Sequence, residues 1–415
     1  MVGCLVAAIH GYFLYSALIH RTYLTDDSIQ YLTIAENLAS SGEFSQGYSP
    51  PLTQDLQRTP GYPIFLLLLG RIPFLVLLVQ HILVLVTAWL IYRAALESYG
   101  PRVASAGAGL YLLQPYPAIF ASMVLSETLF VVLLMAAFWG FLRFWKGGGG
   151  LVLAGAMALL SLGVLVRPVA MPLLLAAVVF LSVRAVRRRS FRPSSWLAIV
   201  LVPLLVVGPW MVRNHQVSGR WMLSSMGSMG MLHGRMGGLE AWREGKPMDE
   251  RHWYMAGDSI AALETGLPGL RSYPVTRQTH ETELLHSDAS WLTVSFFLSH
   301  PWDALRFEIR CIWEMLKGVG YGWARELTLF PAAAIGSAIL QLICNLLMYI
   351  GALLGMRRWR EWGVAETSAF FAILLLLLVS AAVWADGRYR MVVDPFLLVL
   401  TMSVLRRQER SASGG

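Results

Sequence analysis

Two adjacent carboxylates, Asp26 and Asp27, follow the first apolar run of the chain and are the residues best suited to chemistry. From Ile29 onward apolar residues recur at helical spacing, so the pair falls at the N-terminus of a predicted helix. An aspartate there can simply cap the helix by accepting backbone N–H bonds. Two carboxylates can also supply a general base or bind a cation. These interpretations are compatible, because one aspartate can cap while the other faces a substrate.

The same polar stretch ends in a bent segment, Arg58-Thr-Pro-Gly-Tyr-Pro63, that leads into the next apolar residues. Two prolines and a glycine within four residues predict a non-helical entry and explain the bend completely. They do not explain Arg58. An arginine beside an apolar run needs a phosphate, a carboxylate or water as its partner.

The elements that position these residues are predicted to be membrane helices. Apolar types make up 56% of the 415 residues and charged types 14%, whereas a soluble globular chain carries roughly 25% charged residues. The mean hydropathy is +0.57. This composition excludes a soluble enzyme, a disordered chain and a disulfide-stapled secreted module. The net charge of +8 does not indicate a nucleic-acid partner, because much of the basic charge lies in short clusters between apolar runs.

About ten apolar stretches are predicted to cross the membrane, each near the ~20 residues that a helix needs for ~30 Å of hydrocarbon. Their approximate bounds are 2–20, 72–92, 103–121, 123–142, 151–166, 169–183, 196–212, 331–354, 366–384 and 391–405. An even number places both termini on one side, and every short basic loop falls on that side. The positive-inside rule makes it cytoplasmic. We therefore expect a multi-pass protein of the cytoplasmic (inner) membrane with both termini in the cytoplasm.

Two long polar segments, 21–60 and 214–330, then face the periplasm or the cell exterior and hold 18 of the 25 acidic residues. Chemistry that needs a carboxylate is expected on that face. We predict an N-terminal transmembrane module at 1–213, whose first outer loop is catalytic. A mostly helical extracytoplasmic segment follows at 214–330, because so long a segment needs structure of its own. C-terminal transmembrane helices and a cytoplasmic tail complete the chain at 331–415.

Glu127 is predicted inside or at the rim of a membrane span. An ionisable group there is costly unless it is paired, so Glu127 is either functional or part of a structural ion pair. Arg167 lies at a similar predicted depth and is the candidate partner. Apolar residues at helical spacing between Trp302 and Leu316 predict an amphipathic helix. It lies either on the bilayer or against the outer segment.

The first outer loop resembles that of GT-C glycosyltransferases. The pattern Asp-Asp-x-x-x-Tyr-x-x-x-Ala-x-Asn-Leu at 26–38 carries this resemblance, together with Pro50-Pro51 and the Arg58 segment. It is similar in particular to the bacterial, family 39-type branch of protein O-mannosyltransferases and the aminoarabinose transferase of lipid A. Further landmarks follow in the expected order at 126–130, 166–168, 209–214, 299–301, 388–390 and 394–395. The chain departs from relatives at 232–235, where it reads Leu-His-Gly-Arg in place of a terminal Gly-Asn.

The resemblance implies an all-α GT-C fold with about ten transmembrane helices. It implies an enzyme that moves one sugar from a polyprenyl-phosphate donor to an acceptor hydroxyl on the outer membrane face. In the family, the first aspartate of the pair activates the acceptor, and this role maps onto Asp26, with Asp27 in support. The family pattern favours Arg388 and Arg390 as ligands of the donor phosphate.

The chemistry of the residues agrees with this assignment. The attacking hydroxyl needs a base, while the leaving phosphate needs a cation. Arginine fits the phosphate because its guanidinium donates in a fork that matches phosphate oxygens. The predicted phosphate ligands are Arg58, Arg388 and Arg390. The predicted supporting residues are Tyr31, Glu127 and Arg213.

Two other functions stay open. One is a transporter or flippase for a lipid-linked sugar, although no internal duplication is visible and the acids lie in outer loops. The other is an outer-face ligase or polymerase that transfers whole oligosaccharides. The acceptor can be a lipid, a polysaccharide or a protein.

No cofactor is predicted with certainty. The nine histidines and three cysteines show no metal-ligand spacing. A divalent cation can be held by the adjacent aspartates, but two carboxylates alone make a weak site.

Overall fold

The computed structural model of the chain is mostly helical in the part of the chain that it describes. The described residues are 2–188, 193–247, 249–265, 291–328, 330–384 and 387–412. No strand occurs among them. The predicted all-α class is therefore confirmed.

Among the described residues, six helices are long and apolar enough to cross a membrane. They are α1 (Val2–His20), α4 (Pro73–Tyr99), α7 (Glu127–Trp145), α9 (Met171–Arg188), α10 (Pro193–Ser218) and α18 (Pro331–Met356). Shorter apolar helices lie in α8 (Gly150–Val166), α19 (Val364–Trp384) and α20 (Asp394–Ala412). The chain is thus a multi-pass membrane protein. Nine of the ten predicted stretches coincide with these helices.

The tenth stretch, 103–121, is divided into two shorter helices. These are α5 (Pro101–Leu113) and α6 (Pro115–Ala121). Between them Gln114 takes extended backbone angles, φ −67° and ψ 128°. The proline that follows disfavours helical angles at Gln114, because its ring clashes with the preceding residue.

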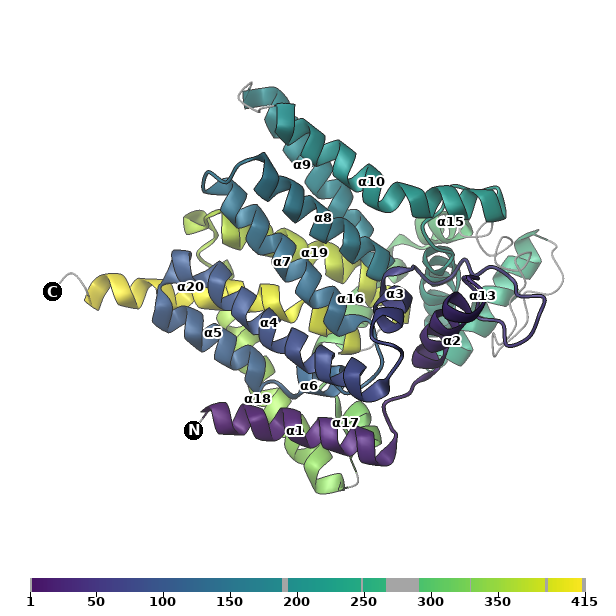
Figure 1. Cartoon of the computed structure of the whole chain (residues 1–415), viewed down its shortest axis with the longest axis horizontal. Helices are drawn as coiled ribbons and strands as arrows, with labels where there is room; N and C mark the ends of the chain where they lie inside the picture. The colour runs from purple at the N-terminus through teal and green to yellow at the C-terminus, as the bar shows by residue number, and fades with distance from the viewer. Residues whose placement is uncertain are drawn as a thin grey trace.

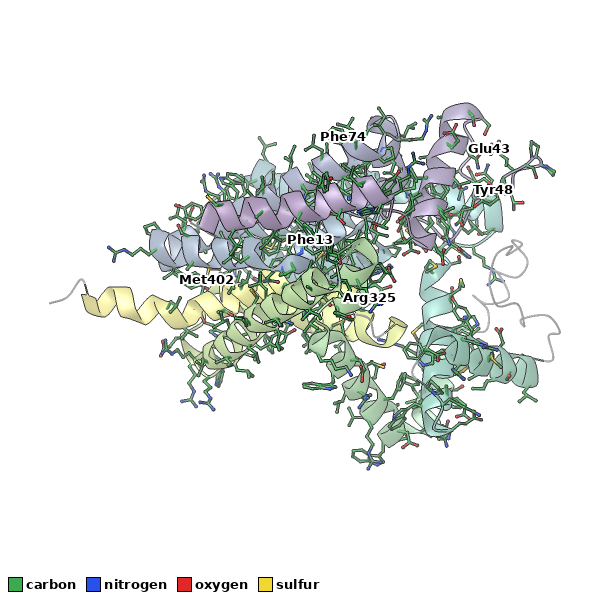
Figure 2. All side chains as sticks on the ribbon, turned by 90° about the horizontal axis from the view of Figure 1, so that it is seen from below. Phe13, Glu43, Tyr48, Phe74, Arg325 and Met402 are labelled. Carbon is green, nitrogen blue, oxygen red and sulfur yellow. The ribbon has the colours of Figure 1, made fainter. Side chains whose placement is uncertain are left out.

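The two long polar segments lie at one end of the helix bundle. The first contains α2 (Asp26–Ser40) and α3 (Gly61–Leu68). Figure 1 shows α2, α3 and α13 at the end of the molecule opposite to the marked C-terminus. In Figure 2 Glu43 and Tyr48 lie at this same end, whereas Met402 of α20 lies toward the other. The carboxylate-rich segments therefore share one side.

The described part of 214–330 is mostly helical. Its elements are α11 (Met226–Met229), the π-helix η2 (Gly230–Gly237), α12 (Gly238–Arg243), α13 (Glu250–Thr265), α15 (Trp291–Ser299), α16 (Pro301–Lys317) and α17 (Tyr321–Leu327). Short 3₁₀ turns elsewhere are η1 (Pro168–Ala170), η3 (Trp359–Glu361) and η4 (Gly387–Val392). The domain boundaries drawn from the sequence stay predictions.

The amphipathic helix predicted near residue 302 is α16, and it has two apolar faces. One face is buried against α12 of the outer segment and against α19 and η4, and it carries Ala304, Phe307, Cys311 and Met315. The other is exposed and carries Trp302, Leu305, Ile309 and Trp313. Packing on the outer segment is therefore confirmed for the first face. Contact of the second face with the bilayer stays a prediction.

The C-terminal helices pack closely because two glycines of α18 face α20. A Cβ atom at Gly355 would overlap the carbonyl oxygen of Leu400, and one at Gly351 would overlap the side chain of Thr401. The missing side chains let the two helices approach at these positions. This contact fixes α20, and η4 precedes α20 directly.

We predict that Gly355→Ala lowers the melting temperature of the detergent-solubilised protein, because overpacking costs about 1–3 kcal/mol. The matched control is Gly336→Ala in the same helix, where an added Cβ has no atom within 4 Å. Alanine favours a helix over glycine, so this control is expected to be neutral or slightly stabilising. Circular dichroism melting curves measure both, and equal shifts would contradict the close α18–α20 contact.

Candidate active site

The helix that carries the acidic pair does not need either aspartate as its side-chain cap. Thr25 is the N-cap, and its hydroxyl accepts the backbone N–H of Ser28 at 3.3 Å. The Ser28 hydroxyl in turn accepts the backbone N–H of Thr25 at 3.0 Å. This capping box leaves both carboxylates available for other contacts. Asp26 and Asp27 are the first two residues of α2, so their side chains project about 100° apart.

Asp27 lies between two guanidinium groups. Its Oδ1 accepts a hydrogen bond from Arg58 at 2.5 Å, and its Oδ2 accepts one from Arg388 at 2.7 Å. Burial by itself would raise the pKa of Asp27, but attraction by Arg58 and Arg388 outweighs it and holds this pKa well below its usual range. Asp27 is therefore ionised at neutral pH.

The contacts continue from Arg388 into the start of α7. Nε of Arg388 lies 3.1 Å from Oε1 of Glu127, and Nη1 of Arg167 lies 2.5 Å from the same oxygen. Glu127 is only 1% exposed, so its charge needs these partners. The predicted Glu127–Arg167 pair is confirmed. We call Arg58, Asp27, Arg388, Glu127 and Arg167 the ion network; three cations and two carboxylates give it a formal charge of +1.

Two further residues of α2 hold Arg58. Its Nη2 and Nε donate to the amide oxygen of Gln30 at 2.6 and 2.9 Å. Its Nη1 donates to the hydroxyl of Tyr31 at 3.2 Å, and its Cζ lies 4.8 Å from the Tyr31 ring centroid. Tyr31 was predicted as a supporting residue, whereas Gln30 was not. Gln30 lies three residues after Asp27, so the two side chains share one face of α2. This spacing could have identified Gln30 from the sequence.

The first outer loop is organised by a carboxylate that the sequence did not single out. Asp55 is buried and accepts the backbone N–H groups of Gln57 and Arg58 at 3.1 and 2.9 Å. Gln46 also donates to it at 3.0 Å. Burial raises the pKa of Asp55, although these hydrogen bonds and the Arg58 charge oppose the rise. Asp55 thus fixes the backbone from which Arg58 extends.

Arg213 holds the other side of this loop. Its guanidinium donates to the backbone oxygen of Asp55 at 2.6 Å and to the side chain of Gln54 at 2.5 Å. It also lies 4.8 Å from the ring centroid of Trp210. The described hydrogen bonds of Arg213 go to the loop and to its neighbour Asn214, rather than to the ion network. Its geometry fits positioning of the loop.

Arg390 lies apart from the ion network although it is only two residues from Arg388. Its Nη1 donates to the backbone oxygens of Gly318 and Leu316 at 2.6 and 3.4 Å, just past α16 and at its end. Its Nε lies 3.3 Å from Asp394, and its Cζ lies 4.3 Å from the Tyr116 ring centroid. A 3₁₀ turn has three residues per turn, so residues two apart point to different sides. Arg388 and Arg390, which were expected to share a phosphate, therefore point to different sides of η4.

Asp26, the predicted base, is exposed at the start of α2. Among the contacts of the described residues, none involves its side chain. No group of three or more His, Cys, Asp or Glu side chains that could hold a metal ion occurs in the described ranges. The divalent cation considered from the sequence stays a prediction.

We predict that Arg390 is an anchor of η4, because it is fully buried and bound on several sides. Arg390→Met should lower the free energy of unfolding by about 3–5 kcal/mol, since it leaves the Asp394 carboxylate buried without its partner. The double variant Arg390→Met/Asp394→Leu should recover part of this loss, because both charges are then removed.

The control is Arg310→Met on α16, whose side chain is 52% exposed and pairs with Glu314. Such a surface pair contributes about 0–1 kcal/mol. Denaturation followed by tryptophan fluorescence compares the variants. An Arg390→Met variant as stable as the control would show that Arg390 is not an anchor.

Residues 62–212 match the family model described as dolichyl-phosphate-mannose-protein mannosyltransferase. No curated protein sequence matches the chain. Two crystal structures of ArnT from Cupriavidus metallidurans are similar at 15% identity. The one bound to undecaprenyl phosphate has a TM-score of 0.41 and covers 99% of this chain and 79% of that one. The apo structure has a TM-score of 0.38 and covers 97% and 78%.

A third similar structure is the archaeal oligosaccharyltransferase AglB from Archaeoglobus fulgidus, in complex with an inhibitory peptide and a dolichol-phosphate. It is 13% identical with a TM-score of 0.47, and the match covers all of this chain and 52% of that one. The matched family segment, 62–212, includes Glu127 and Arg167 of the ion network. This family match over residues 62–212 agrees with the resemblance to GT-C glycosyltransferases found in the sequence.

Proposed function

We propose that the chain transfers a sugar from a polyprenyl-phosphate donor to an acceptor hydroxyl on the outer face of the cytoplasmic membrane. The observation that carries this proposal is the ion network. It joins the first outer loop, the starts of α2 and α7, the end of α8 and the turn before α20. Bringing charged groups from such distant segments together costs desolvation free energy. Binding of a charged substrate is a functional reason for a membrane protein to keep such a group of charges.

Arg58 and Arg388 are the proposed ligands of the donor phosphate. The phosphate leaves with negative charge, which is stabilised by a cation and does not need a proton. The two guanidiniums flank the same carboxylate, Asp27, at 2.5 and 2.7 Å, so both can reach a single anionic group. The formal +1 charge of the network favours an anion. The description of the matched family names a dolichyl-phosphate donor, which agrees with a lipid phosphate here.

Asp26 is the proposed general base, and Asp27 orients the two arginines. Both oxygens of Asp27 accept guanidinium hydrogen bonds and its pKa is lowered, so it is a weak base. Asp26 is exposed, directly adjacent and outside the network. In the proposed step the acceptor hydroxyl loses its proton to Asp26 as its oxygen bonds to the sugar carbon. The bond from that carbon to the phosphate oxygen breaks, and polyprenyl phosphate leaves. The acceptor is a lipid, a polysaccharide or a protein.

Replacing the proposed base should remove transfer while the fold is kept. We predict that Asp26→Asn lowers the turnover rate by about 10²–10⁴-fold, the usual contribution of a general base. The assay supplies purified protein in detergent with a panel of undecaprenyl-phosphate-linked sugars and an envelope extract as the acceptor source. Mass spectrometry measures the release of undecaprenyl phosphate.

The matched control is Glu36→Gln, which removes an exposed carboxylate from the same helix. It should retain full activity. If Asp26→Asn keeps full activity while Asp27→Asn loses it, Asp26 is not the base, and Asp27 becomes the candidate. If the wild-type protein moves the donor between vesicle leaflets without cleaving it, the protein is a transporter and not a glycosyltransferase.

A further inference from the structure

A second group of arginines lies at the end of the bundle away from the ion network. The helices α4, α7 and α9 place Arg93, Arg143 and Arg184, respectively, within their last two turns. The helix α7 begins at Glu127 of the ion network, so its last turn lies at the far end of this helix. α4 packs against α7, α7 against α8 and α8 against α9, and Figure 1 shows α8 between α7 and α9.

Each of these arginines lies over a tryptophan ring. The Cζ of Arg93 is 5.5 Å from the ring centroid of Trp89 and 5.3 Å from that of Trp139. Arg143 lies 5.4 Å from the same Trp139 ring. The two guanidiniums therefore share one indole, within the distance at which a cation is attracted to a ring.

The third arginine extends the surface onto α9. Its Cζ lies 4.5 Å from the ring centroid of Trp145, and that ring stacks on Phe180. We call the six residues the arginine–tryptophan belt: Arg93, Arg143, Arg184, Trp89, Trp139 and Trp145. Tryptophan is enriched at the level of lipid headgroups, because its ring is apolar and its N–H is polar.

The belt has an excess of positive charge. Beside it, Lys146 pairs with Glu97 at 2.7 Å. No ion pair of the described residues includes Arg93, Arg143 or Arg184. These four cations and one carboxylate leave a formal charge of +3. Arg143 lies in the last turn of α7, where the helix dipole also favours a cation but neutralises only a fraction of its charge.

An exposed apolar stripe continues from the belt along α4. Ile82, Leu85, Val86 and Trp89 are 36–51% exposed, and they recur at the spacing of one helix face. A stripe of this kind accommodates acyl chains, while the arginines at its end meet the headgroup. The surface thus has the polarity of a phospholipid: apolar along the helix and cationic at its end.

We propose that the arginine–tryptophan belt binds the phosphate headgroup of an anionic phospholipid whose acyl chains lie along α4. Arg93 and Arg143 donate to the headgroup oxygens, and Arg184 adds positive charge from α9. The proposal is independent of the transfer reaction, since none of these residues contacts the ion network.

Native mass spectrometry of the detergent-solubilised protein, titrated with phosphatidylglycerol or phosphatidylcholine, tests the proposal. Wild type should bind phosphatidylglycerol at least fivefold more tightly than phosphatidylcholine. The double variant Arg93→Gln/Arg143→Gln should lose most of this preference. The milder variant Arg93→Lys/Arg143→Lys keeps the charge but loses the guanidinium fork, so it should show an intermediate loss.

The control is Arg310→Gln/Lys317→Gln, which removes the same formal charge from α16, where both residues pair with Glu314. It should leave the lipid preference unchanged. If the belt double variant fails to fold, the lysine double variant carries the test. Equal affinity of wild type for the two lipids, or the same loss in the control as in the belt variants, would overturn the proposal.

Discussion

The carboxylate of Asp27 joins two arginines from distant parts of the chain. Arg58 comes from the first outer loop and Arg388 from the turn before the last helix, and each binds a different oxygen of Asp27. Removing three charged groups from water is costly, and only close pairing compensates for it. The contact therefore requires the C-terminal helices to lie against the N-terminal half. The α18–α20 crossing at Gly351 and Gly355 fixes α20, which η4 directly precedes.

The residues around Asp27 divide the work of binding and positioning. Glu127 places a second carboxylate at the start of α7, where Arg167 and Arg388 balance its charge. Asp55 and Arg213 fix the first outer loop from its two sides, and Arg390 fixes η4 against α16. The arginines that contact the proposed phosphate are thus held by residues that do not contact it. Such rigid support is what a binding site for a charged group needs, because small displacements weaken charge-assisted hydrogen bonds.

The two ends of the bundle carry different charge chemistry. One end holds the long polar segments, most of the acidic residues and the ion network. At the other end, arginines face tryptophan rings, and Glu97 pairs with Lys146. A lipid-linked donor would reach the first end through the bilayer, which agrees with the absence of a phosphate-binding loop motif from the sequence. The second end is suited to the lipid surface itself.

The sequence by itself determined the helical class and nine of the ten apolar helices, because a run of about 20 apolar residues has few alternatives to a membrane span. It also singled out Asp26, Asp27, Arg58 and Arg388 as candidate site residues and suggested Arg167 as the partner of Glu127. Only the tertiary structure decided that Asp27 bridges two arginines, that Arg390 points away from them, and that Gln30 and Asp55 hold Arg58. The physical reason is that apolar periodicity reports which face of a helix is buried, but not which partner it meets. The direction of a side chain in a short turn such as η4 depends on contacts with segments far away in the chain.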